Sequence, residues 1–240
     1  MSYRIYNENN LVTMDRLLNE KVPVDCVYGD MIYENNDFSW VIDSYSLLRS
    51  HGIFYVQLDH HLAAEMKLEL DRVFGRDNFI NWITTVQEWG GVPKKGFPKK
   101  TDFILMYSKG KDYKWYSERI QIEKATKGTA FDKKGTGLKT PCDCFYDLGN
   151  FSTMSKERVK DESGKNIRWQ KNLKTTQRLL APISDPGDLI YDPFLGSGTT
   201  GVWCIRNNRN FIGSELDEKV FDIASERLKT EYDELNKLSS

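Results

Sequence analysis

The sequence predicts an α/β protein with a predominantly parallel β-sheet and one basic insertion. Short apolar runs typical of buried strands alternate with segments of helical periodicity, and this alternation stops between residues 90 and 165. With 240 residues, the chain is also long enough to bury a sizeable core. We therefore expect three segments: residues 1–89, the basic insertion 90–165, and residues 166–240.

The first segment alternates between strand and helix. Residues 24–28 form a short apolar run, and residues 53–58 form a continuous one, which is typical of a strand buried on both faces. Apolar positions at helical spacing predict helices over residues 38–50 and 61–74. Parallel strands need such crossover helices between them, so this pattern favours a parallel sheet.

Within the insertion, one apolar run at residues 103–108 predicts a single strand among loops. The alternation then resumes with a helix over residues 173–183, a strand over 188–192, a helix from 199, a strand over 210–213 and a helix from 217. We find no internal repeat, so the two alternating segments are expected to share one sheet.

The net charge of −1 conceals a division along the chain. Residues 91–170 contain 18 Lys+Arg and 10 Asp+Glu, whereas the other residues contain 16 and 25. A basic surface on an acidic core predicts a polyanionic partner. No apolar run approaches the ~20 residues of a membrane span, no secretory signal opens the chain, and four cysteines without a Cys-x-x-Cys pair make no disulfide framework. We expect a cytoplasmic protein without membrane contact.

A glycine-rich turn connects the strand at 188–192 to the next helix. It reads Asp192-Pro193-Phe194-Leu195-Gly196-Ser197-Gly198-Thr199-Thr200. Glycines let a ligand approach the backbone, and the helix start offers free N–H groups. Glu215 ends the next strand, where a carboxylate can bind a ribose diol. The pattern predicts a nucleotide-type cofactor site, and its bare Gly-x-Gly-x-x-Gly spacing leaves a nicotinamide-dependent oxidoreductase as an alternative.

The turn, together with Phe211–Glu215, resembles the S-adenosylmethionine-binding motif of amino-group DNA methyltransferases, which modify adenine N6 or cytosine N4. Three further segments resemble the type III modification subunits of restriction–modification systems: Gly52–Asp59, Val73–Ile80 and Phe103–Lys109. The resemblance implies S-adenosyl-L-methionine as cofactor, held by Asp192, Phe194, Gly196, Ser197, Gly198, Thr199, Thr200 and Glu215.

A second segment resembles the family's Gln-Lys-Pro motif, which opens a helix beside the cofactor's carboxylate. Here it reads Gln170-Lys171-Asn172, with asparagine in place of proline. The resemblance implies that these three residues also bind the cofactor. Asn10, near the first helix, is expected beside the cofactor's adenine.

The family's catalytic Asp-Pro-Pro-Tyr motif corresponds to Asp30-Met31-Ile32-Tyr33. The resemblance implies that the Asp30 carboxylate and the Met31 carbonyl accept the N–H groups of the target amine, which localises the nitrogen lone pair. Tyr33 would stack on the base after its extrusion from the duplex. Aspartate rather than serine at position 30 favours adenine N6 over cytosine N4.

Both prolines of that motif are missing, which is expected to leave the backbone freer. Three outcomes stay open: a working enzyme with a relaxed loop, an enzyme with shifted substrate preference such as cytosine N4, or a catalytically silent partner subunit that binds DNA or cofactor. We favour the active enzyme because the cofactor motifs are intact.

The motifs run in the order catalytic, insertion, cofactor, which resembles the β group of these enzymes. The resemblance implies a circularly permuted Rossmann-like methyltransferase fold, with the catalytic half at 1–89, a target-recognition region at 90–165 and the cofactor-binding half at 166–240. Lys94, Lys95, Lys99 and Lys100 are expected to bind DNA. We expect no metal, since Cys142 and Cys144 lack a second ligand pair. A homodimer or a heteromeric methyltransferase partner stays open.

Overall fold

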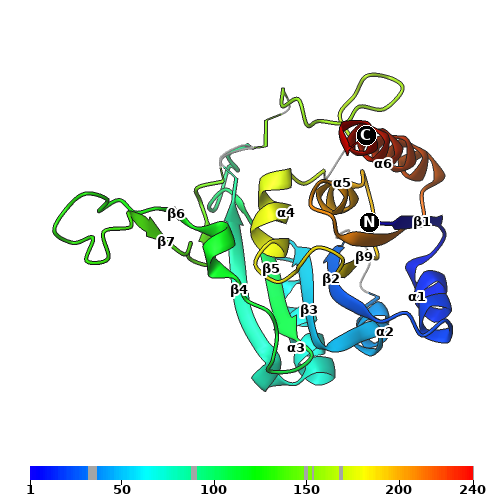
Figure 1. Ribbon diagram of the computed structural model, residues 1–240, viewed down its shortest axis with the longest axis horizontal. Coiled ribbons are helices and arrows are strands. Elements are labelled where there is room, and N and C mark those ends of the chain that lie inside the picture. Colours follow the sequence, from blue (N-terminus) through cyan, green and yellow to red (C-terminus); the bar gives the residue numbers. More distant parts are fainter. Residues whose placement is uncertain (32–36, 88–90, 149–150, 153, 168–169, 240) are drawn as a thin grey trace.

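The computed structural model describes residues 1–31, 37–87, 91–148, 151–152, 154–167 and 170–239. An eight-stranded sheet runs through the molecule in the order β1-β10-β9-β2-β3-β5-β4-β8, with helices on both faces (Figure 1). Its strands are β1 (Tyr3–Asn7), β2 (Val24–Asp30), β3 (Leu48–Leu58), β4 (Phe79–Val86), β5 (Thr101–Ser108), β8 (Cys144–Phe145), β9 (Leu189–Asp192) and β10 (Asn210–Glu215).

The α-helices are α1 (Asn10–Asn19), α2 (Trp40–Leu47), α3 (Ala63–Phe74), α4 (Leu173–Leu180), α5 (Thr199–Arg206) and α6 (Glu218–Ser239). Two short 3-10 helices lie at Arg76–Asn78 and Ser117–Ile120, and β6 (Ile122–Glu123) pairs with β7 (Leu138–Lys139) in a separate two-stranded sheet. Within the described ranges, every helix is too short or too polar to cross a membrane.

The strands β1, β10, β9, β2 and β3 are mutually parallel, which confirms the expected parallel sheet. β5 then runs antiparallel to both β3 and β4, and β8 lies parallel to β4. The strand expected at residues 103–108 is therefore present as β5 and belongs to the main sheet. The division into three segments, and the recognition role of the second, stay predictions.

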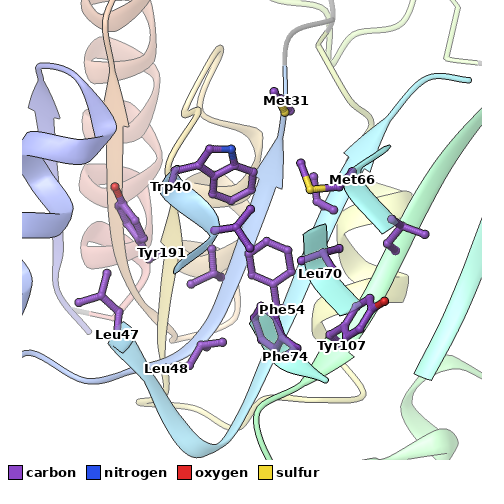
Figure 2. Packing of buried hydrophobic residues seen from close by; sticks show 14 of the residues in the cluster. Met31, Trp40, Leu47, Leu48, Phe54, Met66, Leu70, Phe74, Tyr107 and Tyr191 are labelled. Carbon is purple, nitrogen blue, oxygen red and sulfur yellow. The ribbon is translucent and has the colours of Figure 1, made fainter. Parts of the chain in front are cut away.

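Each face of the sheet has its own apolar core. Side chains such as Phe54 pack with α1, α2 and α3, whereas their strand neighbours such as Tyr55 pack with α4, α5 and α6. Figure 2 shows the first of these cores, where Trp40 of α2 and Phe74 of α3 surround Phe54. Burial on both faces explains why β3 reads as a continuous apolar run.

The helix predicted over residues 38–50 is wrong at its end. α2 ends at Leu47, and Leu48 already has extended backbone as the first residue of β3. Gly52 lies inside β3, where a Cβ would come within 2.8 Å of the Leu48 side chain. The pairing register between β2 and β3 shifts at this place. The strand therefore follows the helix without a turn and contains an irregularity beside this glycine.

Neighbouring strands bring the two sequence motifs together. β2 pairs in parallel with β9, with Val27 opposite Tyr191, so both strands end at the same edge of the sheet. Asp30 ends β2 and Asp192 ends β9. Ligands of open parallel sheets bind outside this edge.

Candidate functional site

A cavity of about 580 Å³ opens at the carboxyl ends of β2, β9 and β10. Most of the predicted site residues line it: Asp30, Met31, Gln170, Lys171, Asp192, Phe194, Gly196, Ser197, Thr199, Thr200 and Glu215. Asn10, expected near an adenine, lines the same cavity. Its volume suits a cofactor-sized ligand.

The glycine turn has the backbone that its composition predicts. Gly196 and Gly198 adopt positive φ angles of 51° and 77°, which disfavour other residues, and Gly198 immediately precedes α5. Gly201 serves packing instead, because a Cβ there would come within 2.7 Å of Leu228 on α6. The turn thus exposes backbone to the cavity while α5 lies close against α6.

Glu215 is fixed in place by backbone groups on both sides. Its Oε2 accepts a hydrogen bond from the Gly196 N–H at 2.9 Å, and its Oε1 accepts one from the Asp217 N–H at 2.9 Å. The carboxylate therefore joins the end of β10 to the glycine turn and faces the cavity with its orientation set.

Arg227 on α6 supports the turn from behind, and the sequence analysis missed it. Its guanidinium donates to the Ser197 carbonyl at 2.8 Å and to Thr199 Oγ1 at 3.3 Å. Burial lowers the pKa of Arg227. A lone arginine beside the buried face of an amphipathic helix, next to Ala224 and Leu228, is the signal that could have identified it.

Asp192 is the most deeply buried acid of the site, at 2% exposure. Burial, together with the nearby carboxylates of Asp30 and Glu215, raises its pKa to about 7. Hydrogen bonds from the Thr200 hydroxyl and from the Phe194 N–H, at 3.0 Å, oppose the shift. Asp192 therefore changes its charge near neutral pH.

Asp30 forms an ion pair across the cavity with Lys171, with Nζ and Oδ1 3.1 Å apart. Lys171 comes just before α4, so the pair joins the two halves of the chain. Burial raises the pKa of Asp30, and the Lys171 ammonium opposes this shift. Both side chains stay partly exposed, at 19% and 15%, so the carboxylate is accessible to a ligand.

Met31 compensates in part for the missing proline. Its N–H donates to the Gln57 carbonyl at 3.1 Å, a bond that proline cannot make. Its side chain is 2% exposed and belongs to the core beneath the sheet (Figure 2). The expected loosening of the backbone is offset at this residue. Ile32 and Tyr33 lie outside the described residues, so base stacking by Tyr33 stays a prediction.

Gln170 and Asn172 bind the protein's own backbone. The Gln170 amide accepts from the Val159 N–H at 2.9 Å and donates to the Glu157 carbonyl at 2.6 Å. Asn172 caps α4 by accepting the Thr175 N–H at 2.7 Å, and it does not line the cavity. Asparagine is a favoured helix cap, which explains its presence where the related motif has proline. Its contact with the cofactor stays a prediction.

The four predicted DNA-binding lysines, Lys94, Lys95, Lys99 and Lys100, lie outside the cavity in the loop between β4 and β5. Just after β3, the side-chain atoms of Asp59, His60 and His61 that are able to bind a metal ion lie within 4.8 Å of one another. The His61 ring is 2.5 Å from the Asp59 carboxylate, which also accepts the His61 N–H. This cluster lies at the start of the turn into α3.

A parallel sheet whose glycine turn and acidic residue border one cavity defines an α/β protein that binds a nucleotide-type cofactor. A family model described as DNA methylase matches residues 30–226. The chain belongs to the DNA methylase family.

Curated relatives agree with this assignment. The type II methyltransferase M.HpaI of Haemophilus parainfluenzae is 25% identical over 194 residues, which are 80% of this chain and 58% of that protein. M.EcaI of Enterobacter cloacae is 26% identical, over 73% of this chain and 52% of its own length. The chain thus spans about half the length of these relatives.

Solved structures show the same fold. The M1.HpyAVI–SAM complex matches with a TM-score of 0.70 and 20% identity, over 94% of this chain and 98% of that one. The PvuII DNA methyltransferase, described as cytosine-N4-specific, matches with a TM-score of 0.68 and 13% identity, over 97% and 92%. The mixed α/β fold is confirmed, whereas the circular permutation and the likeness to type III subunits stay predictions.

Asp192→Asn should stabilise the protein in a pH-dependent way. The folded-state pKa of Asp192 is raised above its unfolded value. As the pH rises from about 4 to about 7, ionisation of Asp192 therefore lowers the free energy of unfolding progressively, and the full loss is present above about pH 7. We expect the variant to raise the free energy of unfolding by about 2–4 kcal/mol at about pH 8 and by less at about pH 5. Urea unfolding at both pH values measures this, and an equal effect at both would contradict the shift.

Proposed function

We propose that this protein is an S-adenosylmethionine-dependent DNA methyltransferase that transfers a methyl group to the exocyclic N6 of adenine after base flipping. The observation that carries the proposal is that Asp30 and the glycine turn border one cavity. Membership of the DNA methylase family and the S-adenosylmethionine complex of a protein with the same fold support it.

The residues around the cavity suit this cofactor. Lys171 can hold a carboxylate, the buried Asp192 can balance cationic groups, and Glu215 is oriented to accept hydrogen bonds from a ribose diol. When bound, S-adenosylmethionine supplies an electrophilic methyl group on a sulfonium. The described residues that line the cavity include five carboxylates, of Glu8, Asp30, Asp192, Glu215 and Asp217, and one lysine, and this negative balance favours such a cationic donor.

Asp30 supplies the catalytic anion in this proposal. Its carboxylate accepts an N–H of the target amine and so opposes delocalisation of the lone pair into the ring. Once the nitrogen has gained the methyl group it carries a positive charge and must lose a proton, and Asp30 is placed to accept it. Its raised pKa makes it a better proton acceptor than an exposed carboxylate.

Cytosine N4 is the second candidate target. Aspartate at position 30 favours adenine, whereas the PvuII enzyme of the same fold is cytosine-specific. The catalytically silent partner is the other alternative, and the Met31 N–H bond to Gln57 argues against it because it holds the strand end beside Asp30 in place. The exposed lysines of the β4–β5 loop support DNA as the partner.

Asp30→Asn should abolish most methyl transfer, because it removes the negative charge and keeps the shape. We expect a loss of about 100-fold or more in labelled methyl transfer from S-adenosylmethionine to genomic duplex DNA. Asp15→Asn, on the exposed side of α1, is the matched control and should act like the wild type.

Chromatography of the hydrolysed product should show N6-methyladenine, and N4-methylcytosine would support the second target. A wild-type protein without transfer would indicate the silent partner.

Lys171→Met should move the acidic limb of the pH–rate profile to higher pH. The ammonium lowers the pKa of Asp30, so its removal raises that pKa and leaves less ionised carboxylate under acidic conditions. The loss of kcat/KM should therefore be larger at about pH 6 than at about pH 8.5, with Lys171→Arg close to the wild type. A uniform loss at all pH values would mean that Lys171 does not act through Asp30.

A further inference from the structure

The loop between β4 and β5 presents an apolar tip to solvent. Phe97 is 95% exposed, the highest value among the large apolar side chains that the structure describes, and Val92 in the same loop is 81% exposed. Gly96 precedes Phe97 with a φ of 83°, and Pro98 follows it, which restricts Phe97 to extended backbone. Phe97 therefore lies on a turn of restricted backbone conformation. Because its side chain is exposed, it can bind a partner without losing contacts with the core.

The sheet register places this loop at the edge where Asp30 lies. Asp30 pairs with Gln57 of β3, and Gln57 pairs with Ile104 of β5. Asp30, Gln57 and Ile104 thus lie in one row across the sheet. Thr101, where β5 begins, is three residues from Ile104, so it lies about 10 Å beyond this row in the direction of the cavity. The hairpin closes there, with the Gln87 N–H donating to the Lys100 carbonyl at 2.7 Å.

The charge around the tip is positive. Residues 91–100 contain no acidic side chain and four lysines, Lys94, Lys95, Lys99 and Lys100. Burial lowers the pKa of His60 at the end of β3, and the nearby side chains of His61 and Lys99 lower it further. The loop therefore extends its positive charge toward the strand ends that border the site.

We propose that Phe97 is an apolar wedge that enters the base stack of duplex DNA beside the nucleotide whose base is extruded, while the loop lysines bind the flanking phosphates. The inference rests on the proposed function. Extrusion of a base leaves a gap in the stack, and an aromatic side chain fills it by stacking on the remaining bases. Apolar wedges of this kind also unstack and kink DNA. The lysines favour a polyanion as the partner. Because an exposed phenylalanine lies among them, the polyanion expected here is one with stacked bases, that is, a nucleic acid.

Relaxation of closed circular plasmid by a type I topoisomerase, with saturating protein present, measures the unwinding that a wedge causes. The wild type should change the linking number of the relaxed plasmid, Phe97→Ala should lose this change, and Phe97→Trp should retain it. Phe131→Ala is the matched control, because Phe131 is 79% exposed beside Lys133 and Lys134 in the β6–β7 hairpin, which projects away from the main sheet (Figure 1). This control should unwind DNA like the wild type.

Binding to a mixed-sequence labelled duplex separates the wedge from the phosphate contacts. Phe97→Ala should weaken binding by about 5- to 100-fold without changing the salt dependence. Replacing Lys94 and Lys95 together by alanine should reduce the salt slope by about two. Unwinding by Phe97→Ala equal to the wild type, or an equal loss in Phe131→Ala, would overturn the wedge. If one of these results is found while the wild type transfers methyl groups to DNA, the wedge is wrong and the proposed function still holds. A wild type that binds no duplex contradicts both proposals.

Discussion

The parallel pairing of β2 with β9 is the constraint on which the rest of the site depends. It brings the last residues of two strands, Asp30 and Asp192, to one edge although 161 positions separate them in the chain. The glycine turn follows β9 directly, and Glu215 ends the next strand, β10, and fixes the turn through Gly196. The Asp30 carboxylate and the glycine turn therefore border one cavity because their strands are paired in the sheet.

The electrostatics of the cavity follow from burial at that edge. Desolvation raises the pKa of both Asp30 and Asp192, and the Asp30 carboxylate makes Asp192 harder to ionise. Lys171 is the cation placed against Asp30, and it keeps this acid closer to its ionised form. In the proposed function, the cationic methyl donor would likewise favour the ionised form of these carboxylates.

The sequence predicted most of the parallel sheet and most of the residues that line the cavity, because fully buried strands and the glycine turn leave local patterns. It did not predict β1 or β4, whose side chains are largely half-buried and form no continuous apolar run. The Lys171–Asp30 pair and the Arg227 contact with the turn join distant parts of the chain, which no local pattern reports. The sequence also did not predict that Asn172 caps α4, because capping depends on the exact residue at which the helix begins.

The central claim is that Asp30 and the glycine turn serve one reaction centre. A crystal structure of the protein with S-adenosylmethionine tests it most directly. We expect the cofactor's methionine part on the glycine turn, its ribose at Glu215 and its methyl group directed at the Asp30 carboxylate. A cofactor bound elsewhere, or a methyl group separated from Asp30 by protein side chains, would contradict it.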